Sequence, residues 1–107
     1  MTDSPQLTTT FAALADETRW AVLQRVGRSP ASASELSQEF PVSRQAIVKH
    51  LDVLREVGLV EADRHGRAVV FHAVGARLNE LGHDLRRMAA VWDRRLAAIK
   101  RSAEAPD

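Results

Sequence analysis

The chain has 107 residues, of which 45% are hydrophobic and 27% are charged, a composition typical of an ordinary globular domain. It contains no cysteine, which excludes disulfide bonds, thiolate metal sites and thiol redox sensing. The formal net charge is only +1, which is too small for a protein that coats nucleic acid without regard to sequence.

No apolar run approaches the roughly 20 residues that a membrane-spanning helix needs. The N-terminal stretch also lacks the basic-then-apolar order of a signal peptide. We therefore expect a cytoplasmic protein with no membrane partner. We also expect a single domain over residues 1–107, with flexible tails at 1–6 and 102–107.

Two helices are predicted at the start of the chain. The first covers about 7–15 and has an apolar side that includes Leu7 and Phe11. Asp16 is a suitable N-cap for the second, because its carboxylate can accept hydrogen bonds from the free N–H groups of the first turn. We expect Gly27 to end this second helix. Its predicted buried face consists of Trp20, Val22, Leu23 and Val26.

A brief helix follows, over about 34–40. The stretch from Ser32 to Glu35 fits a capping box, in which each side chain accepts a hydrogen bond from the other residue's backbone N–H. Leu36 and Phe40 are the residues expected to point inward.

A longer helix is predicted over 43–57. Ser43 is a good N-cap, apolar residues recur behind it at helical spacing, and Gly58 is placed to end the helix in a left-handed conformation. With the brief helix before it, this helix forms a helix-turn-helix.

The polar face of helix 43–57 carries two cations and an amide in its first half, and no acid. Such a face suits the major groove of DNA, because Arg, Lys and Gln side chains hydrogen-bond the edges of bases there. Taken alone, the helix fits an ordinary solvated surface equally well; the elements that flank it favour DNA. The face consists of Arg44, Gln45, Val48, Lys49 and Asp52.

After Gly58 the pattern changes to that of two strands, over 59–64 and 68–73. Gly66 supplies the positive φ of the turn between them. A hairpin over 59–73 directly after a helix-turn-helix predicts a winged helix-turn-helix, a fold that is mainly α with a two-stranded β-wing. The wing tip would present Arg64, His65 and Arg67 to phosphates or to the minor groove.

From about 76 to 101 the pattern is again helical, and its narrow apolar stripe resembles a coiled-coil seam. A helix this long cannot bury the whole stripe against so small a domain. We therefore expect a second copy of the chain as partner, with the first helix completing the interface. Two-fold symmetry then predicts a pseudo-palindromic DNA site. The alternative is a monomer in which the helix folds back. The stripe consists of Leu78, Leu81, Leu85, Met88, Trp92, Leu96 and Ile99.

Several segments resemble the ArsR/SmtB family of bacterial winged-helix repressors. FAALADETR at 11–19 is similar to the family's opening, and 34–36, 42–51 and 58–60 match its helix-turn-helix and the start of its wing. The resemblance implies a homodimeric DNA-binding regulator, usually a repressor, that dimerises through its first and last helices. The DNA contacts that it implies are Ser43, Arg44, Gln45, Lys49 and His50 on the helix and Arg64 and Arg67 on the wing. The dimer contacts that we predict are Leu7, Phe11, Leu81, Leu85, Met88, Trp92 and Leu96.

Gln45 and Val48 depart from the family pattern, which has a proline or small residue and a serine at these places. Both departures indicate a different base preference. His50 either contacts a phosphate or packs between helices, and the sequence leaves both open. For Arg19 a structural role beside an acid is favoured over contact with the DNA backbone.

Many members of this family release DNA when they bind metal. The cysteine pair that one family site uses is absent, since 36–40 reads LSQEF. The other site type uses Asp, His and Glu on the last helix, but only Asp93 stands where its second ligand cluster would be. We therefore expect no metal and no cofactor. The remaining candidates for ligands are His72, Glu80, His83 and Asp84.

The stretch 92–96 is similar to the end of a metal-free branch of the family. Trp92 lines an effector pocket or belongs to the core, and its spacing favours the core. The sequence identifies no effector.

Two other classes of function were weighed. A protein-interaction module could keep the winged-helix shape, but the absence of an acid between Arg44 and Lys49 favours DNA as the partner. An enzyme is not expected, because there are no paired carboxylates in a plausible cleft, no nucleophile with a base and no glycine-rich phosphate loop.

Overall fold

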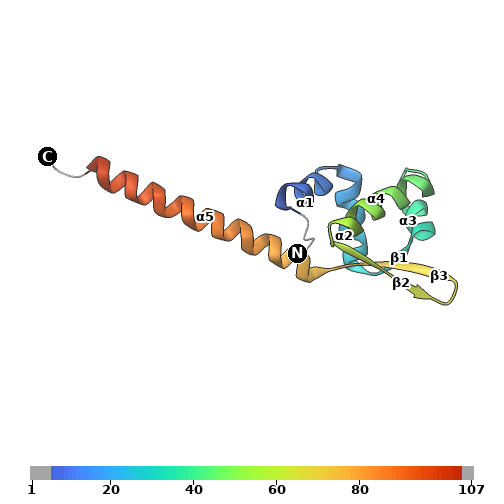
Figure 1. Ribbon diagram of the computed structural model, residues 1–107. Helices are drawn as coiled ribbons and strands as arrows, with labels where there is room; N and C mark the ends of the chain where they lie inside the picture. The colour runs from blue at the N-terminus through green and yellow to red at the C-terminus, as the bar shows by residue number, and fades with distance from the viewer. Residues whose placement is uncertain (1–5, 105–107) are drawn as a thin grey trace. The chain divides into compact units, whose positions relative to one another are not determined.

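The computed structural model describes residues 6–104 (Figure 1). The chain divides into two compact units, residues 1–77 and 78–107, which are treated separately below. The winged helix-turn-helix order is confirmed. The elements are α1 Leu7–Leu14, α2 Glu17–Arg28, β1 Ala31–Ser32, α3 Ala33–Glu39, α4 Arg44–Glu56, β2 Val60–His65, β3 Ala68–Ala73 and α5 Gly75–Glu104.

All three predicted N-caps are confirmed. The Asp16 carboxylate accepts from the backbone N–H of Arg19 at 2.9 Å and opens α2. Ser32 and Glu35 form the complete capping box of α3, with N···O distances of 3.1 and 2.9 Å. Ser43 accepts from the N–H of Ala46 at 3.1 Å and opens α4. These bonds fix the starting residue of each helix, because they satisfy donors that no helical carbonyl can reach.

The capping carboxylate of Glu35 makes stability depend on acid pH. Its pKa is lowered from 4.5, first because it accepts the backbone N–H of Ser32. The group thus contributes stability that is fully present above pH 4.5 and is lost as the pH falls through the folded-state value. We expect Glu35→Gln to retain the box but lose this contribution to the acid dependence. Urea midpoints measured against pH should show a shallower decline for this variant than for the wild type.

The matched control for this titration is Glu56→Gln, which removes an exposed carboxylate from outside any cap. The Glu56→Gln variant should follow the wild-type acid profile. An identical profile for Glu35→Gln would contradict the role of the capping carboxylate.

Several predicted boundaries and burials were wrong. Gly27 lies inside α2, which runs one residue further to Arg28 because the Ser29 N–H still bonds the Arg25 carbonyl. Trp20 is not in the core: it is 46% exposed. Phe40 is half-buried and lies at the C-cap of α3.

The predicted tails are only partly covered by the described residues. At the C-terminus α5 continues to Glu104, so 102–104 are helical where a tail was predicted. Residues 1–5 and 105–107 lie outside the described part of the chain. The single-domain assignment for 1–107 stays a prediction.

A third strand, β1, completes the sheet and was not predicted. It pairs antiparallel with β3, with Ala31 opposite Phe71, and the strand order is β1-β3-β2. The wing itself agrees with the prediction: β2 and β3 are antiparallel, and Gly66 in the turn has φ 64°. A strand as short as β1 carries no periodicity of its own, so only its long-range pairing reveals it.

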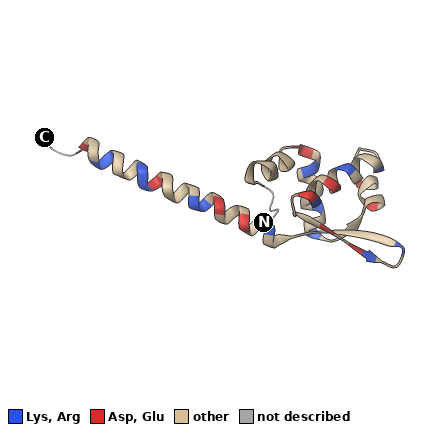
Figure 2. Ribbon diagram, in the orientation of Figure 1, with Lys and Arg blue, Asp and Glu red and all other residues tan. Residues whose placement is uncertain are grey.

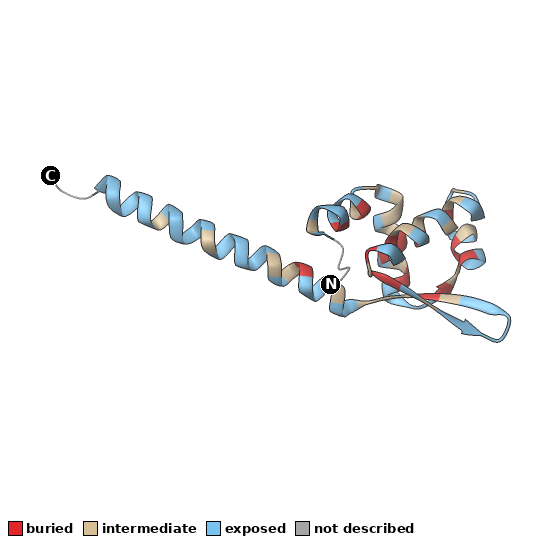
Figure 3. Cartoon of the chain, in the orientation of Figure 1, coloured by how far each residue is buried: buried red, intermediate tan, exposed pale blue. Residues whose placement is uncertain are grey.

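The core of the first unit lies where α4 packs against α2, α3 and the sheet. Its largest fully buried side chains include Leu36, Ile47, Leu51, Leu54 and Leu59 (Figure 3). Three of these come from α4 at helical spacing, so one whole face of that helix is committed to the core. The opposite face of α4 is therefore left for solvent or a partner.

Arg77 ties α1 to the end of α4. Its Nε donates to the Val57 carbonyl at 3.2 Å, and one of its terminal nitrogens donates to Thr10 Oγ1 at 3.0 Å. Thr10 is fully buried and its hydroxyl donates to the Gln6 carbonyl at 3.2 Å. Sequence analysis did not identify this network, which satisfies a buried hydroxyl and one of the free carbonyls at the C-terminal end of α4.

Most of the apolar stripe of α5 is exposed within the chain. Trp92 is 58% exposed and Leu81 is buried. The place of Trp92 in a core or an effector pocket stays a prediction. In Figure 3 most of α5 is coloured as exposed. None of the helices in residues 6–104 combines the length and hydropathy that a bilayer crossing requires.

Candidate nucleic-acid interface

The outward face of α4 is polar and positively charged at its N-terminal end. Arg44, Gln45 and Lys49 are exposed, Val48 is half-buried between them, and Ser43 caps the helix. The inward face is formed by the buried leucines and Ile47, so the polar residues cannot turn inward without breaking the core. Arg44, Gln45 and Lys49 thus share an exposed face, as the sequence predicts.

Arg44 occupies a position that helix electrostatics disfavours. It is the first residue of α4, where the helix dipole is positive, and the first turn contains no acid to compensate. A cation there costs on the order of 0.3–1 kcal/mol in an isolated helix. Its Nε donates to Ser34 Oγ of α3 at 3.2 Å. A residue that breaks a local rule in this way is often retained for function rather than stability.

A groove of about 550 Å³ runs between α4 and the wing. Arg44, Arg55 and Arg67 stand on its walls together with one carboxylate, that of Asp52, and the apolar side chains of Val48, Val69 and Phe71 contribute to its lining. A groove with several guanidinium groups is suited to a phosphate backbone, since each can pair with phosphate oxygens. Sequence analysis did not single out Arg55, because nothing in its helical spacing shows that it faces the wing.

The wing tip is exposed and basic. Arg64 and His65 close β2, and Arg67 follows Gly66 in the turn; all three side chains are exposed. Figure 2 shows the blue of Lys and Arg residues at the tip of the hairpin. The turn depends on Gly66, since its positive φ is unfavourable for a residue with a Cβ. The predicted wing contacts are therefore free to meet a partner.

Arg19 and His50 contact each other. Arg19 Nε donates to the Ala13 carbonyl at 2.6 Å, and one terminal nitrogen lies 3.3 Å from His50 Nδ1. Arg19 thus links α1, α2 and α4, which agrees with the structural role favoured for it. His50 is half-buried between helices, while its contact with DNA stays a prediction.

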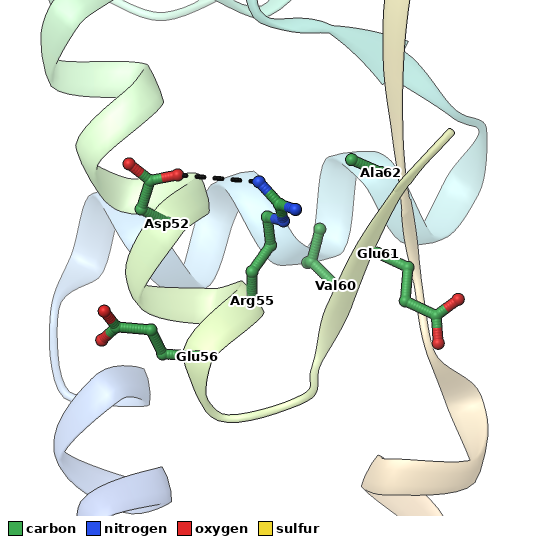
Figure 4. A pocket seen from close by; sticks show the side chains of 6 residues that line it. All are labelled: Asp52, Arg55, Glu56, Val60, Glu61 and Ala62. Atoms are coloured by element: carbon green, nitrogen blue, oxygen red, sulfur yellow. Dashed lines mark ion pairs between the residues drawn. The ribbon is translucent and has the colours of Figure 1, made fainter. Parts of the chain in front are cut away.

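An acidic hollow of about 560 Å³ borders the C-terminal half of α4 (Figure 4). Asp52, Glu56 and Glu61 line it, and Arg55 lies 4.0 Å from the Asp52 carboxylate. Phosphates would be repelled from the three carboxylates, so the N-terminal half of the helix is the part of α4 that best suits a phosphate. The charge on α4 therefore changes sign along its length.

The metal-ligand candidates are not brought together. His72 lies between two carboxylates of β2, with its Nε2 3.6 Å from Glu61 and its Nδ1 3.1 Å from Asp63. Asp84 instead pairs with Arg87 on α5. Within residues 6–104 no group of three or more His, Asp or Glu side chains is arranged to hold a metal ion.

The fold and this surface define a DNA-binding winged helix-turn-helix protein. Residues 14–62 match a helix-turn-helix domain family. The chain is 38% identical over 86 residues to the HTH-type transcriptional regulator Rv2034 of Mycobacterium tuberculosis, covering 80% of this chain and 78% of that one.

Solved structures agree with these sequence matches. An ArsR-like transcriptional regulator from Rhodococcus sp. RHA1 is 53% identical and superposes with a TM-score of 0.88, covering 94% of each chain. A second relative found by sequence, the HTH-type transcriptional regulator NmtR of M. tuberculosis, is 30% identical over 76 residues, covering 71% of this chain and 63% of NmtR. The chain belongs to the ArsR family of transcriptional regulators. The relative Rv2034 and the Rhodococcus protein are both described as transcriptional regulators.

Proposed function

We propose that the protein is a homodimeric repressor that binds a pseudo-palindromic operator, with helix 43–57 in the major groove and hairpin 59–73 beside it. The observation that carries the proposal is the division of α4 into two faces. Ile47 and Leu51 on one face are fully buried, and Arg44 and Lys49 on the other are exposed at a capped N-terminus.

Affinity and specificity would come from different residues. Phosphate contacts supply most of the affinity and make it fall with salt, and base edges in the major groove supply the discrimination. Arg64 and Arg67 of the wing are assigned to phosphates, and His50 either contacts a phosphate or packs between helices. Arg44, Gln45 and Lys49 are assigned to base edges in the major groove, with Ser43 at the end of the helix that enters the groove first.

The homodimer rests on exposed apolar surface. Besides the α5 stripe, Phe11 of α1 is 37% exposed, and Leu7 is half-buried. Aliphatic and aromatic side chains aligned along one helix face are stabilised when a matching face covers them. Two copies related by a two-fold axis would bury the same stripe twice and present two recognition helices.

The test is a gel shift of the purified protein on its own upstream DNA, titrated first with salt and then with zinc or EDTA. We expect specific binding that weakens steeply with salt and is indifferent to zinc and EDTA. Release by zinc would contradict the metal-independent part of the proposal. If upstream DNA is not bound, selection from genomic fragments should still recover a specific site; recovery of none would contradict DNA recognition.

Arg44→Ala should weaken binding to the selected duplex by about 1–3 kcal/mol and relax the preference at one base pair, if the side chain is bidentate to a guanine. The measurement compares affinities for the selected duplex and for duplexes with single guanines replaced. Arg28→Ala, which removes an exposed cation from α2, is the control for the charge change. Unchanged site preference in Arg44→Ala would contradict the base contact.

A further inference from the structure

A hydrogen bond joins the two helices of the helix-turn-helix at their exposed ends. Ser34 Oγ on α3 accepts from Arg44 Nε on α4 at 3.2 Å, across ten positions of sequence. Both residues also line the groove between α4 and the wing. The bond therefore lies on the surface to which the DNA contacts are assigned.

Both partners belong to helix first turns that are fixed by caps. Ser34 lies inside the capping box formed by Ser32 and Glu35. Arg44 directly follows the N-cap Ser43. The backbones on both sides of the bond are thus held by their own hydrogen bonds, so the short Ser34 side chain has less freedom to move than the longer arginine side chain that it accepts from.

The bond uses one edge of the guanidinium group and leaves another free. The guanidinium is planar, and its five N–H donors point in fixed directions. When Nε is held, rotation of the plane is restricted, and the two terminal nitrogens remain available side by side. Among the described residues neither of them has a hydrogen-bond partner. A pair of parallel donors matches the O6 and N7 acceptors of guanine in the major groove.

We propose that Ser34 is a specificity-determining positioning residue, which fixes the Arg44 guanidinium so that its free edge reads one guanine of the operator. This inference rests on the proposed function. Ser34 itself carries no charge and adds nothing to phosphate attraction. Its loss releases Arg44 to sample other directions, in which it meets phosphates or other bases, so discrimination falls while overall attraction to DNA is retained.

The experiment uses the full-length protein and a duplex that the wild type enriches from a random-sequence pool. Affinities are measured for this duplex, for a copy with each guanine replaced in turn, and for unrelated DNA. Ser34→Ala should lower the preference for one guanine about threefold to tenfold, the range for the loss of one ordinary, solvent-exposed hydrogen bond. Binding to unrelated DNA and the salt dependence should not change.

Three further variants separate the explanations. Ser37→Ala removes a matched hydroxyl from the same helix that bonds only within α3, and it should keep the wild-type preference. Ser34→Thr retains the hydroxyl and should also keep the wild-type guanine preference. Ser34→Ala should have no further effect in an Arg44→Ala background, because the two residues act as a unit. Circular dichroism melting of each variant confirms that it is folded.

Several results would overturn the inference. An unchanged guanine preference in Ser34→Ala shows that the bond does not position Arg44. If Ser34→Ala weakens binding to all DNA equally and makes the salt dependence shallower, then Arg44 contacts a phosphate and not a guanine. An effect that persists in the Arg44→Ala background shows that Ser34 acts independently of Arg44. If the wild type enriches no duplex at all, the proposed function itself fails, and that result is distinct from the three above.

Discussion

Glutamate in place of Leu85 should convert the proposed dimer into a monomer and weaken operator binding about a hundredfold or more. Leu85 is 44% exposed in the single chain and lies in the middle of the α5 stripe. In a two-fold dimer it would be buried in both copies, so the substitution would place two carboxylates in an apolar seam. A monomer loses the advantage of two linked half-sites, which is typically a factor of about 10²–10⁴.

The matched control for the dimer test is Ala90→Glu. Ala90 is exposed on the face of α5 opposite the stripe. Its substitution by glutamate therefore introduces the same charge into the same helix without touching the seam. Light scattering after size-exclusion chromatography measures the mass, and a gel shift measures operator binding. We expect Ala90→Glu to stay dimeric. A dimer in Leu85→Glu would place the interface elsewhere, and a monomeric wild type would refute the dimer altogether.

Leu51→Ala should destabilise the protein by about 2–5 kcal/mol, the range for deleting a fully buried leucine side chain. Leu51 is 0% exposed and lies at the centre of the α4 face that packs into the core. The loss of stability has two parts: the transfer free energy of the removed side-chain atoms and the free-energy cost of the cavity that they leave. Because small domains have a stability of only about 5–15 kcal/mol, this loss is a large fraction of the total free energy of unfolding.

Urea denaturation followed by circular dichroism measures this difference. Lys49→Ala on the same helix is the control, since Lys49 is exposed and surface substitutions of this kind usually stay within about 0.5 kcal/mol. The two variants should therefore have opposite effects: Leu51→Ala lowers stability but leaves the DNA-facing side chains intact, and Lys49→Ala lowers DNA affinity but not stability. A change below about 1 kcal/mol in Leu51→Ala would contradict the assigned core.

The sequence by itself determined the features that depend on neighbouring residues. Asp16, Ser32 and Ser43 were identified as caps because a short polar side chain reaches N–H groups only a few positions away. Gly58 and Gly66, with φ of 78° and 64°, are predictable because the C-terminal end of a helix and a tight hairpin each need a residue without a Cβ penalty. The helices, the wing and the family followed from such local signals.

Only the tertiary structure decided the features that depend on distant residues. The pairing of β1 with β3, the bond from Arg44 to Ser34 and the contact of Arg19 with His50 each join parts of the chain that no local pattern relates. The exposure of Trp20 was mistaken for burial, because an apolar residue at helical spacing reads the same whether a neighbouring element covers it or not. Periodicity shows that a helix has an apolar face. Which part of that face is covered within the chain, and which polar side chains meet across the groove, is set by the packing of elements far apart in sequence.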